Sequence, residues 1–122
     1  LKNIKNAIPS DSIGTPVQHQ FVSAEIVKND FHISDEDVLN AIRFHTTGRE
    51  NMSQFEKLIY VSDLISYERN FQGVESLRKA VYNDFEKGFI TCLTYSRDYV
   101  VETGRAVYPF TDKAINFYKE NL

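Results

Sequence analysis

The spacing of apolar and polar residues predicts a chain built from helices. Apolar side chains recur three and four residues apart at Val17, Phe21, Ala24, Val27 and Phe31, which is the period of one face of an α-helix. The same pattern returns, in approximate ranges, at 34–48, 53–65, 74–85, 89–104 and 111–118. No segment alternates at period two for long enough to predict a strand. The sequence therefore predicts an all-α fold of about five to seven helices.

Residues with strong positional preferences mark the expected helix ends. Ser34 precedes three acidic residues and is expected to cap the second helix. Ser53–Glu56 has the capping-box pattern that opens a third helix, and Thr111–Asp112 is expected to open the last one. Gly48 is expected to end the second helix. Gly88 is expected either to end or to bend the fourth.

The first residues differ from the rest of the chain. Leu1–Ile8 resembles the tail of a helix, and Pro9–Pro16 has the prolines, glycine and short polar residues of a loop. Residues 1–16 carry little that could close a core, and the chain starts with leucine. We therefore expect an N-terminal part to be missing, and residues 17–122 to form one domain.

Composition excludes several classes of protein. The 122 residues carry 14 basic and 17 acidic side chains, a net charge of −3. This balance argues against nucleic-acid binding, which needs a basic face. The single Cys92 cannot form an internal disulfide and is expected to be a buried apolar residue. With no long apolar run and no signal-peptide pattern, we expect a cytoplasmic protein without a membrane partner.

The segment Ala41–Arg49 carries the first candidate chemistry. His45 shares the apolar stripe of its helix, so it is either a buried, hydrogen-bonded histidine or a functional one. Thr46–Arg49 supplies two hydroxyls, a glycine and a guanidinium. It is either an ordinary helix end or a phosphate-binding segment, in which hydroxyls, N–H groups and an arginine fork converge.

Three further residues are candidates. Asp63 is a carboxylate within an apolar helix, which is costly unless the group is paired or binds metal. Histidine nitrogens and aspartate oxygens together suit iron, manganese or zinc, so His19 and Asp63 are possible ligands, or else simply paired polar groups. Arg69 lies in a polar loop six residues after Asp63 and could reach the same site. His32, at a helix end, is expected to be a surface or capping residue.

Four segments together resemble a known family: Ala41–Arg49 (Ala-Ile-Arg-Phe-His-Thr-Thr-Gly-Arg), Met52–Asp63, Arg69–Glu75 and Gly104–Thr111. They resemble the YqeK-type HD-domain phosphohydrolases, which are bacterial symmetrical bis(5'-nucleosyl)-tetraphosphate hydrolases. The resemblance runs from about residue 19 to the C-terminus. It implies an HD-domain-like helical bundle, of which the chain is the C-terminal two-thirds. It also implies cleavage of diadenosine tetraphosphate to two ADP by water that a divalent metal activates, most often iron, with manganese, zinc or magnesium as alternatives.

The resemblance also implies roles for residues. Asp63, His19 and His45 would be metal ligands, and both histidines could instead contact phosphate. The phosphates would be held by Thr46, Thr47, Gly48, Arg49 and Arg69. The nucleoside would lie against a loop of Val107, Tyr108, Pro109 and Thr111.

One departure from the family pattern limits these implications. The chain contains no His-Asp dipeptide, the pair that names the superfamily, and Gln20 follows His19 where the family usually has glycine. We therefore expect this fragment to be poorly active alone, and to dimerise or to bind the missing N-terminal piece. The alternative is a non-catalytic helical module that binds nucleotides or proteins.

Overall fold

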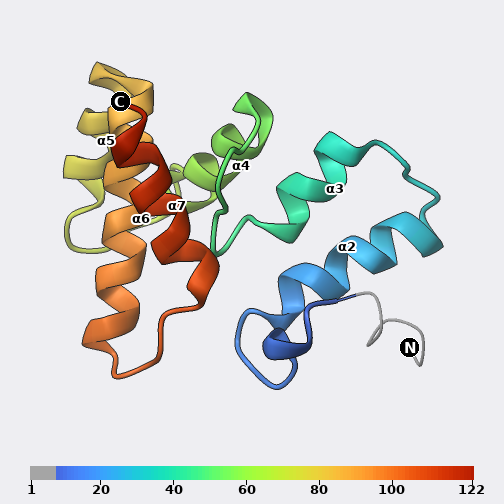
Figure 1. The fold of residues 1–122 in the computed structure, drawn as a ribbon. Helices are drawn as coiled ribbons and strands as arrows, with labels where there is room; N and C mark the ends of the chain where they lie inside the picture. The colour runs from blue at the N-terminus through green and yellow to red at the C-terminus, as the bar shows by residue number, and fades with distance from the viewer. Residues whose placement is uncertain (1–7) are drawn as a thin grey trace.

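Helices alone make up the secondary structure of the part of the chain described, residues 8–122, in a computed structural model (Figure 1). A short 3₁₀ turn, η1, precedes six α-helices in these residues. Their bounds are η1 Ser10–Ser12, α2 Gln18–Asp30, α3 Glu36–Arg43, α4 Gln54–Ile65, α5 Val74–Asn83, α6 Phe85–Glu102 and α7 Pro109–Glu120. The expected all-α fold is confirmed.

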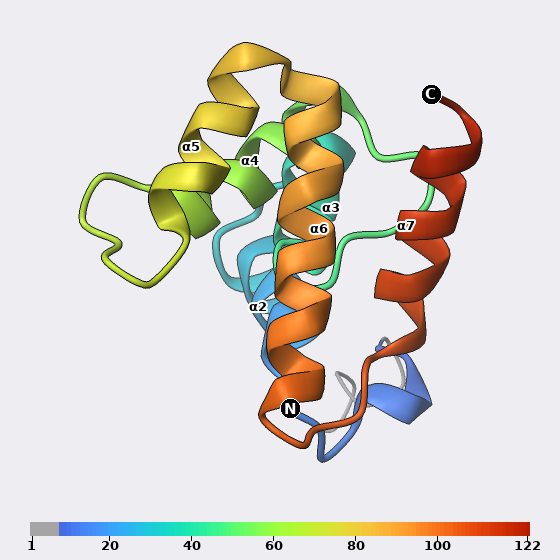
Figure 2. The same cartoon turned by 90° about the vertical axis from the view of Figure 1, so that its left-hand side faces the viewer.

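The main core lies among α4, α5, α6 and α7. Helix α6 is the longest and packs against α4, α5 and α7 (Figure 2). Phe89 and Leu93 of α6 are fully buried at its centre. The buried cluster comprises Met52, Tyr60, Val61, Leu77, Phe89, Ile90, Cys92, Leu93, Ala114, Ile115 and Tyr118. The burial expected for Cys92 is therefore confirmed.

Helices α2 and α3 form a separate antiparallel pair beside this core. They pack on each other, and α3 packs on α4 (Figure 1). Aromatic rings join α2 to the end of α3 and to the start of α7. The ring centroid of Phe21 lies 6.0 Å from that of Phe44, after α3, and 6.3 Å from that of Phe110, in α7. The fold thus consists of a four-helix body and a helix pair attached along one side.

Two expectations about α3 were wrong. Asp35, not Ser34, caps the helix: its side chain accepts hydrogen bonds from the N–H groups of Asp37 and Val38. The carboxylate reaches the open N–H groups from the position directly before the first turn. The helix ends at Arg43 rather than at Gly48, with Phe44 as C-cap. His45 therefore lies on a turn after the helix instead of on its apolar stripe.

The boundaries of the later helices also differ from expectation. The break between α5 and α6 falls at Asp84, whose extended backbone and side chain cap α6. Gly88 does not end a helix but is buried inside α6, where an added Cβ would lie 2.5 Å from the Val81 Cα. The last helix starts at Pro109 rather than Thr111, because proline suits the first helical position.

Other expectations hold. The capping box is confirmed, since Ser53 and Glu56 exchange both of its hydrogen bonds at the start of α4. The polar segment after α4 is a loop until α5 begins at Val74. The helix tail expected for the first residues falls on 1–7, outside the described residues. In the part of the chain that the structure describes, no helix has the length and apolar character to cross a membrane.

Candidate functional site

A cavity of about 670 Å³ lies where the helix pair meets the four-helix body. Its size is within the range of clefts that hold small ligands. Its walls come from η1 and the following loop, the turn after α3, one face of α4, one face of α6, and the segment that joins α6 to α7. The lining residues are Asp11, Thr15, Pro16, Val17, His45, Thr46, Thr47, Tyr60, Asp63, Leu64, Tyr95, Ser96, Arg97, Tyr99, Val100, Arg105, Ala106, Val107, Tyr108, Pro109 and Thr111.

The turn after α3 is held on both sides by buried hydrogen bonds. On one side, the Gln20 amide of α2 accepts from the Thr46 N–H at 3.0 Å and donates to Thr47 Oγ1 at 3.0 Å. On the other, the Thr111 hydroxyl of α7 donates to the Thr47 carbonyl at 2.8 Å. Gln20, Thr47 and Thr111 are all buried. Gly48 allows the chain to leave this turn, because its φ of +70° favours glycine.

His19 and His45 face each other at the edge of the cavity, with ring centroids 5.4 Å apart and planes at 78°. His19 Nδ1 lies 2.7 Å from the Pro16 carbonyl, and His45 Nδ1 lies 2.6 Å from the Ile42 carbonyl. A carbonyl oxygen only accepts, so each Nδ1 carries the proton. Both Nε2 atoms therefore present lone pairs when the rings are neutral, and the Thr46 hydroxyl donates to His19 Nε2 at 3.4 Å.

Asp63 lines the cavity from α4, but it is exposed rather than buried. Its side chain is 55% exposed, and its Oδ1 lies 3.7 Å from Arg69 Nη2. The Arg69 Nε also donates to the Asp63 main-chain carbonyl at 3.1 Å. The burial that the apolar run implied for this carboxylate was wrong, because the side of α4 that carries residue 63 is open to solvent. Arg69 does reach Asp63, as expected from its place in the loop.

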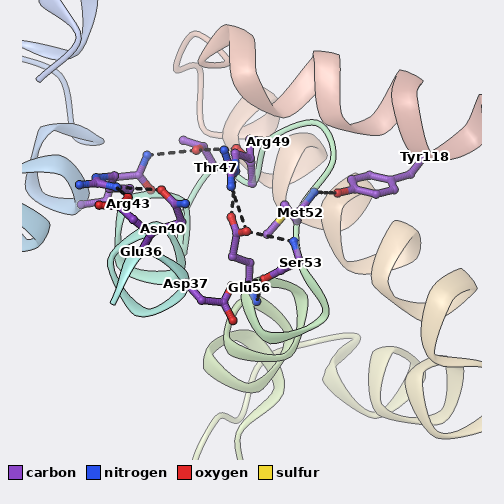
Figure 3. A network of polar contacts seen from close by, with 12 residues as sticks. Glu36, Asp37, Asn40, Arg43, Thr47, Arg49, Met52, Ser53, Glu56 and Tyr118 are labelled. Carbon is purple, nitrogen blue, oxygen red and sulfur yellow. Dashed lines mark hydrogen bonds and ion pairs between the residues drawn. The ribbon is translucent and has the colours of Figure 1, made fainter. Parts of the chain in front are cut away.

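Arg49 does not line the cavity but forms an ion pair with Glu56 of α4 (Figure 3). Its Nε and Nη2 donate to the two carboxylate oxygens of Glu56 at 2.8 and 3.0 Å, and its guanidinium lies 4.6 Å from the Phe44 ring centroid. Glu56 is 2% exposed and also accepts from the Ser53 N–H at 2.9 Å. Burial alone would raise the pKa of Glu56, but the hydrogen bonds from Arg49 and Ser53 outweigh it and the pKa is lowered.

The phosphate-binding set expected from the sequence is thus divided by the structure. His45, Thr46 and Thr47 line the cavity, whereas Gly48, Arg49 and Arg69 do not. His19 reaches the site through its contacts with His45 and Thr46. All four residues of the expected nucleoside loop line the cavity.

The described residues do not by themselves fit a metal centre. In 8–122, no three side chains of histidine, cysteine, aspartate or glutamate converge closely enough to hold an ion. His19 and His45 offer two nitrogen lone pairs, while the Asp63 carboxylate pairs with Arg69. On its own, the histidine pair can accept hydrogen bonds or bind a proton.

Several cavity residues were missed by the sequence analysis. Arg97 and Arg105 bring positive charge to the cavity from α6 and the segment after it, and Tyr95 and Tyr99 bring aromatic rings. Tyr95 and Tyr99 are four residues apart on α6, a spacing that puts them on one face, but nothing in the sequence shows that this face borders a cavity.

The joining segment 105–109 is tied to the N-terminal turn. The Tyr108 hydroxyl donates to Asp11 Oδ1 at 2.6 Å, a contact between residues 97 positions apart. Figure 2 shows this segment passing beside the η1 region below α6 and α7. The contact therefore links two of the segments that line the cavity.

Proteins of known sequence resemble the chain. No protein-family model matches it. It is 40% identical over 98 residues to a symmetrical bis(5'-nucleosyl)-tetraphosphatase of Halalkalibacterium halodurans, covering 80% of this chain and 52% of that protein. It is 35% identical over 99 residues to the protein of the same name in Bacillus subtilis, covering 81% and 53%. The chain thus spans about half the length of the curated relatives it matches.

A solved structure resembles the fold over nearly the whole chain. It is the crystal structure of a predicted HD superfamily hydrolase involved in NAD metabolism from Clostridium acetobutylicum. The two superpose with a TM-score of 0.86 at 33% sequence identity, covering 99% of this chain and 68% of the other. The likeness therefore includes both the helix pair and the four-helix body.

Proposed function

Because the chain belongs to the YqeK-type family of HD-domain hydrolases, we propose that it is the nucleotide-holding part of a phosphohydrolase that cleaves diadenosine tetraphosphate symmetrically to two ADP. The curated relatives carry the name of this activity. The observation that carries the proposal for this chain is the cavity, which combines aromatic walls with a basic, hydrogen-bonding edge. A dinucleoside polyphosphate has the same two parts.

The aromatic part of the cavity suits a nucleoside. Tyr99 and Val100 line it from α6, and Val107, Tyr108 and Pro109 line it from the segment that leads into α7. A purine ring placed there would be covered by flat apolar surfaces, which favour stacking. This part of the cavity would therefore bind the adenosine.

The polar edge suits phosphate. The Arg105 guanidinium donates from Nε to the Thr103 hydroxyl at 3.1 Å, and the other described residues leave its remaining N–H groups available. Arg97 is already paired with Asp112 at 2.9 Å, which makes it the weaker candidate. Thr46 and His45 line the cavity from the turn after α3. In the proposed complex, Arg105 and Thr46 donate to phosphate oxygens, and a protonated His45 adds charge.

We expect binding to survive in the isolated chain and turnover to be poor. The described residues contain no complete set of metal ligands, and the metal of the proposed enzyme would need ligands beyond them. Iron, manganese, zinc and magnesium remain the candidate ions. The nucleotide contacts proposed above, by contrast, all come from this chain.

Calorimetric titration of the 122-residue chain with ADP tests the proposal. We expect Arg105→Gln to weaken ADP binding by about tenfold, the cost of one charged hydrogen-bonding partner, and to leave adenosine binding unchanged. Tyr108→Ala should weaken the binding of both. Arg43→Gln is a matched control, because Arg43 pairs with the exposed Glu36 and does not line the cavity. No detectable ADP binding, or equal binding by the Arg105 variant, would contradict the proposal.

Release of ADP from diadenosine tetraphosphate with added ferrous or manganous ion tests the second part. Turnover equal to that of the full-length Bacillus subtilis protein would overturn the expectation of poor activity. The alternative is a non-catalytic nucleotide-binding module. It would be favoured if the full-length protein binds nucleotide without turnover and its encoded sequence upstream of Leu1 lacks a histidine and a His-Asp pair. We retain this second candidate function because the described residues contain no cluster of three metal ligands.

A further inference from the structure

Gln20 is a fully buried amide between the two parts of the fold. Its relative exposure is 0%, and both ends of its amide are used by the turn after α3. An amide left unpaired in this position would cost the full penalty of burying a polar group. The two bonds therefore select one position of α2 along the turn.

The residues next to these bonds are the two histidines of the site. His19 precedes Gln20 on α2, and His45 precedes Thr46, whose N–H donates to the Gln20 Oε1. Each ring is one residue away from the bonded pair, so a shift of α2 along the turn would change the distance between the rings directly. The Thr46 hydroxyl, 3.4 Å from His19 Nε2, would move with them.

Apolar contacts do not provide this register. Phe21 holds α2 against Phe44, Phe110 and Tyr108 with ring centroids 6.0 to 6.3 Å apart. Such contacts resist separation of the helices, but their energy varies little when one helix slides slightly along another. Hydrogen bonds, by contrast, weaken steeply with distance and angle. The directional contacts between α2 and the turn are those of Gln20, apart from the long contact of His19 with Thr46.

We propose that Gln20 is a positioning residue, which sets His19 and His45 at the separation needed to contact one phosphate group. The inference rests on the proposed nucleotide-binding function and assigns a role to the residue at which the chain departs from the family pattern. Gln20 itself does not touch the ligand. It acts through the Thr46–Thr47 turn.

The test uses Gln20→Met, which keeps the size of the side chain and removes both hydrogen bonds. The readout is the imidazole ¹⁵N and ¹H signals of the three histidines, measured without and with ADP. In the unsubstituted chain we expect His19 and His45 to carry the proton on Nδ1. In the variant their signals should move, those of His32 should not, and ADP affinity should fall by about tenfold, the effect of 1.4 kcal/mol.

Gln18→Met is the matched control. Gln18 lies on the same helix and accepts from the Gly14 N–H at 2.8 Å, but it does not bond the turn. This variant should leave the signals of His45 and the ADP affinity unchanged. Gln20→Glu retains an oxygen for the Thr46 N–H and, when protonated, a donor for Thr47, so it should restore both readouts in part.

The outcomes are separable. If folded Gln20→Met keeps the histidine signals and ADP affinity of the unsubstituted chain, the positioning role is refuted. If that variant does not fold by circular dichroism, Thr47→Val removes the bond from Gln20 Nε2 together with the bond that the Thr47 hydroxyl donates to the Gly48 carbonyl. Unchanged His45 signals in that variant would equally refute the role. If the unsubstituted chain binds no ADP, the proposed function fails. The histidine signals still decide whether Gln20 determines the relative position of His19 and His45.

Discussion

The ion pair between Arg49 and Glu56 gives the sharpest prediction about stability. We expect Arg49→Met to leave the Glu56 carboxylate buried with the hydrogen bond that it accepts from the Ser53 N–H. Removing one partner of a fully buried pair costs about 3–5 kcal/mol. The Glu56 side chain is 2% exposed but that of Arg49 is 32% exposed, so water screens the pair from one side. We therefore expect a loss of about 2–3 kcal/mol, including the contact with the Phe44 ring.

The assay is urea and thermal unfolding followed by circular dichroism. For a chain of this length, a loss of that size corresponds to a fall in Tm of about 10 °C. Arg43→Met is the matched control: Arg43 pairs with Glu36, whose side chain is 67% exposed, so its loss should cost no more than about 1 kcal/mol. Equal destabilisation by the two substitutions would falsify the reasoning, since the burial of Glu56 is its premise.

The same pair predicts a pH dependence. The pKa of Glu56 lies below its ordinary value of 4.5 in the folded chain, so the ionised pair stabilises the fold fully above that value. The contribution is lost as the pH falls through the lowered pKa. The difference in unfolding free energy between the unsubstituted chain and Arg49→Met should therefore be largest near neutral pH and shrink below about pH 4. A difference that grows on acidification would contradict the assignment.

Three more predictions concern the buried core. Gly88→Ala should lower the unfolding free energy by about 1–3 kcal/mol, because the added Cβ would lie 2.5 Å from the Val81 Cα; a gain in stability, as alanine gives in an unhindered helix, would show that α5 and α6 are not so close. Tyr60→Phe should be neutral or stabilising, because the buried Tyr60 hydroxyl has no hydrogen-bond partner among the described residues. Tyr118→Phe should cost about 1–2 kcal/mol, because the Tyr118 hydroxyl accepts from a buried main-chain N–H at 2.5 Å; urea unfolding of both variants compares them.

Helix type and number could be predicted from the sequence because the signals are local. The apolar period predicts α2, and the exchange of hydrogen bonds between Ser53 and Glu56 needs only four consecutive residues. The errors arose where two local signals competed. Asp35 and Ser34 are both good caps, and Pro109 and Thr111 both open helices. Thr111, which does not open the last helix, donates to the Thr47 carbonyl instead.

The site was predicted less completely because its contacts are long-range. His45, Thr46 and the 107–111 segment do line the cavity, but their assigned roles stay predictions. The ion pair of Arg49 could not be predicted from the sequence. Glu56 already had a role in the capping box with Ser53, and Arg49 reaches the same carboxylate from across a loop. Gln20 carried no signal beyond its departure from the family, and its partners are 26 and 27 residues away.

The division of the fold into a helix pair and a four-helix body has a consequence for amide hydrogen exchange. The continuous apolar cluster draws its residues from α4, α5, α6, α7 and Met52, and none from α2 or α3. Units with fewer shared apolar contacts open at lower free energy than the whole chain unfolds. Amides of α2 should therefore exchange through a partial opening that leaves α6 protected, and ADP should slow that exchange selectively if it bridges the turn at Thr46 and the α6 wall. One wall of the cavity then belongs to the slowest-exchanging region of the protein, and a ligand can enter or leave without disturbing it.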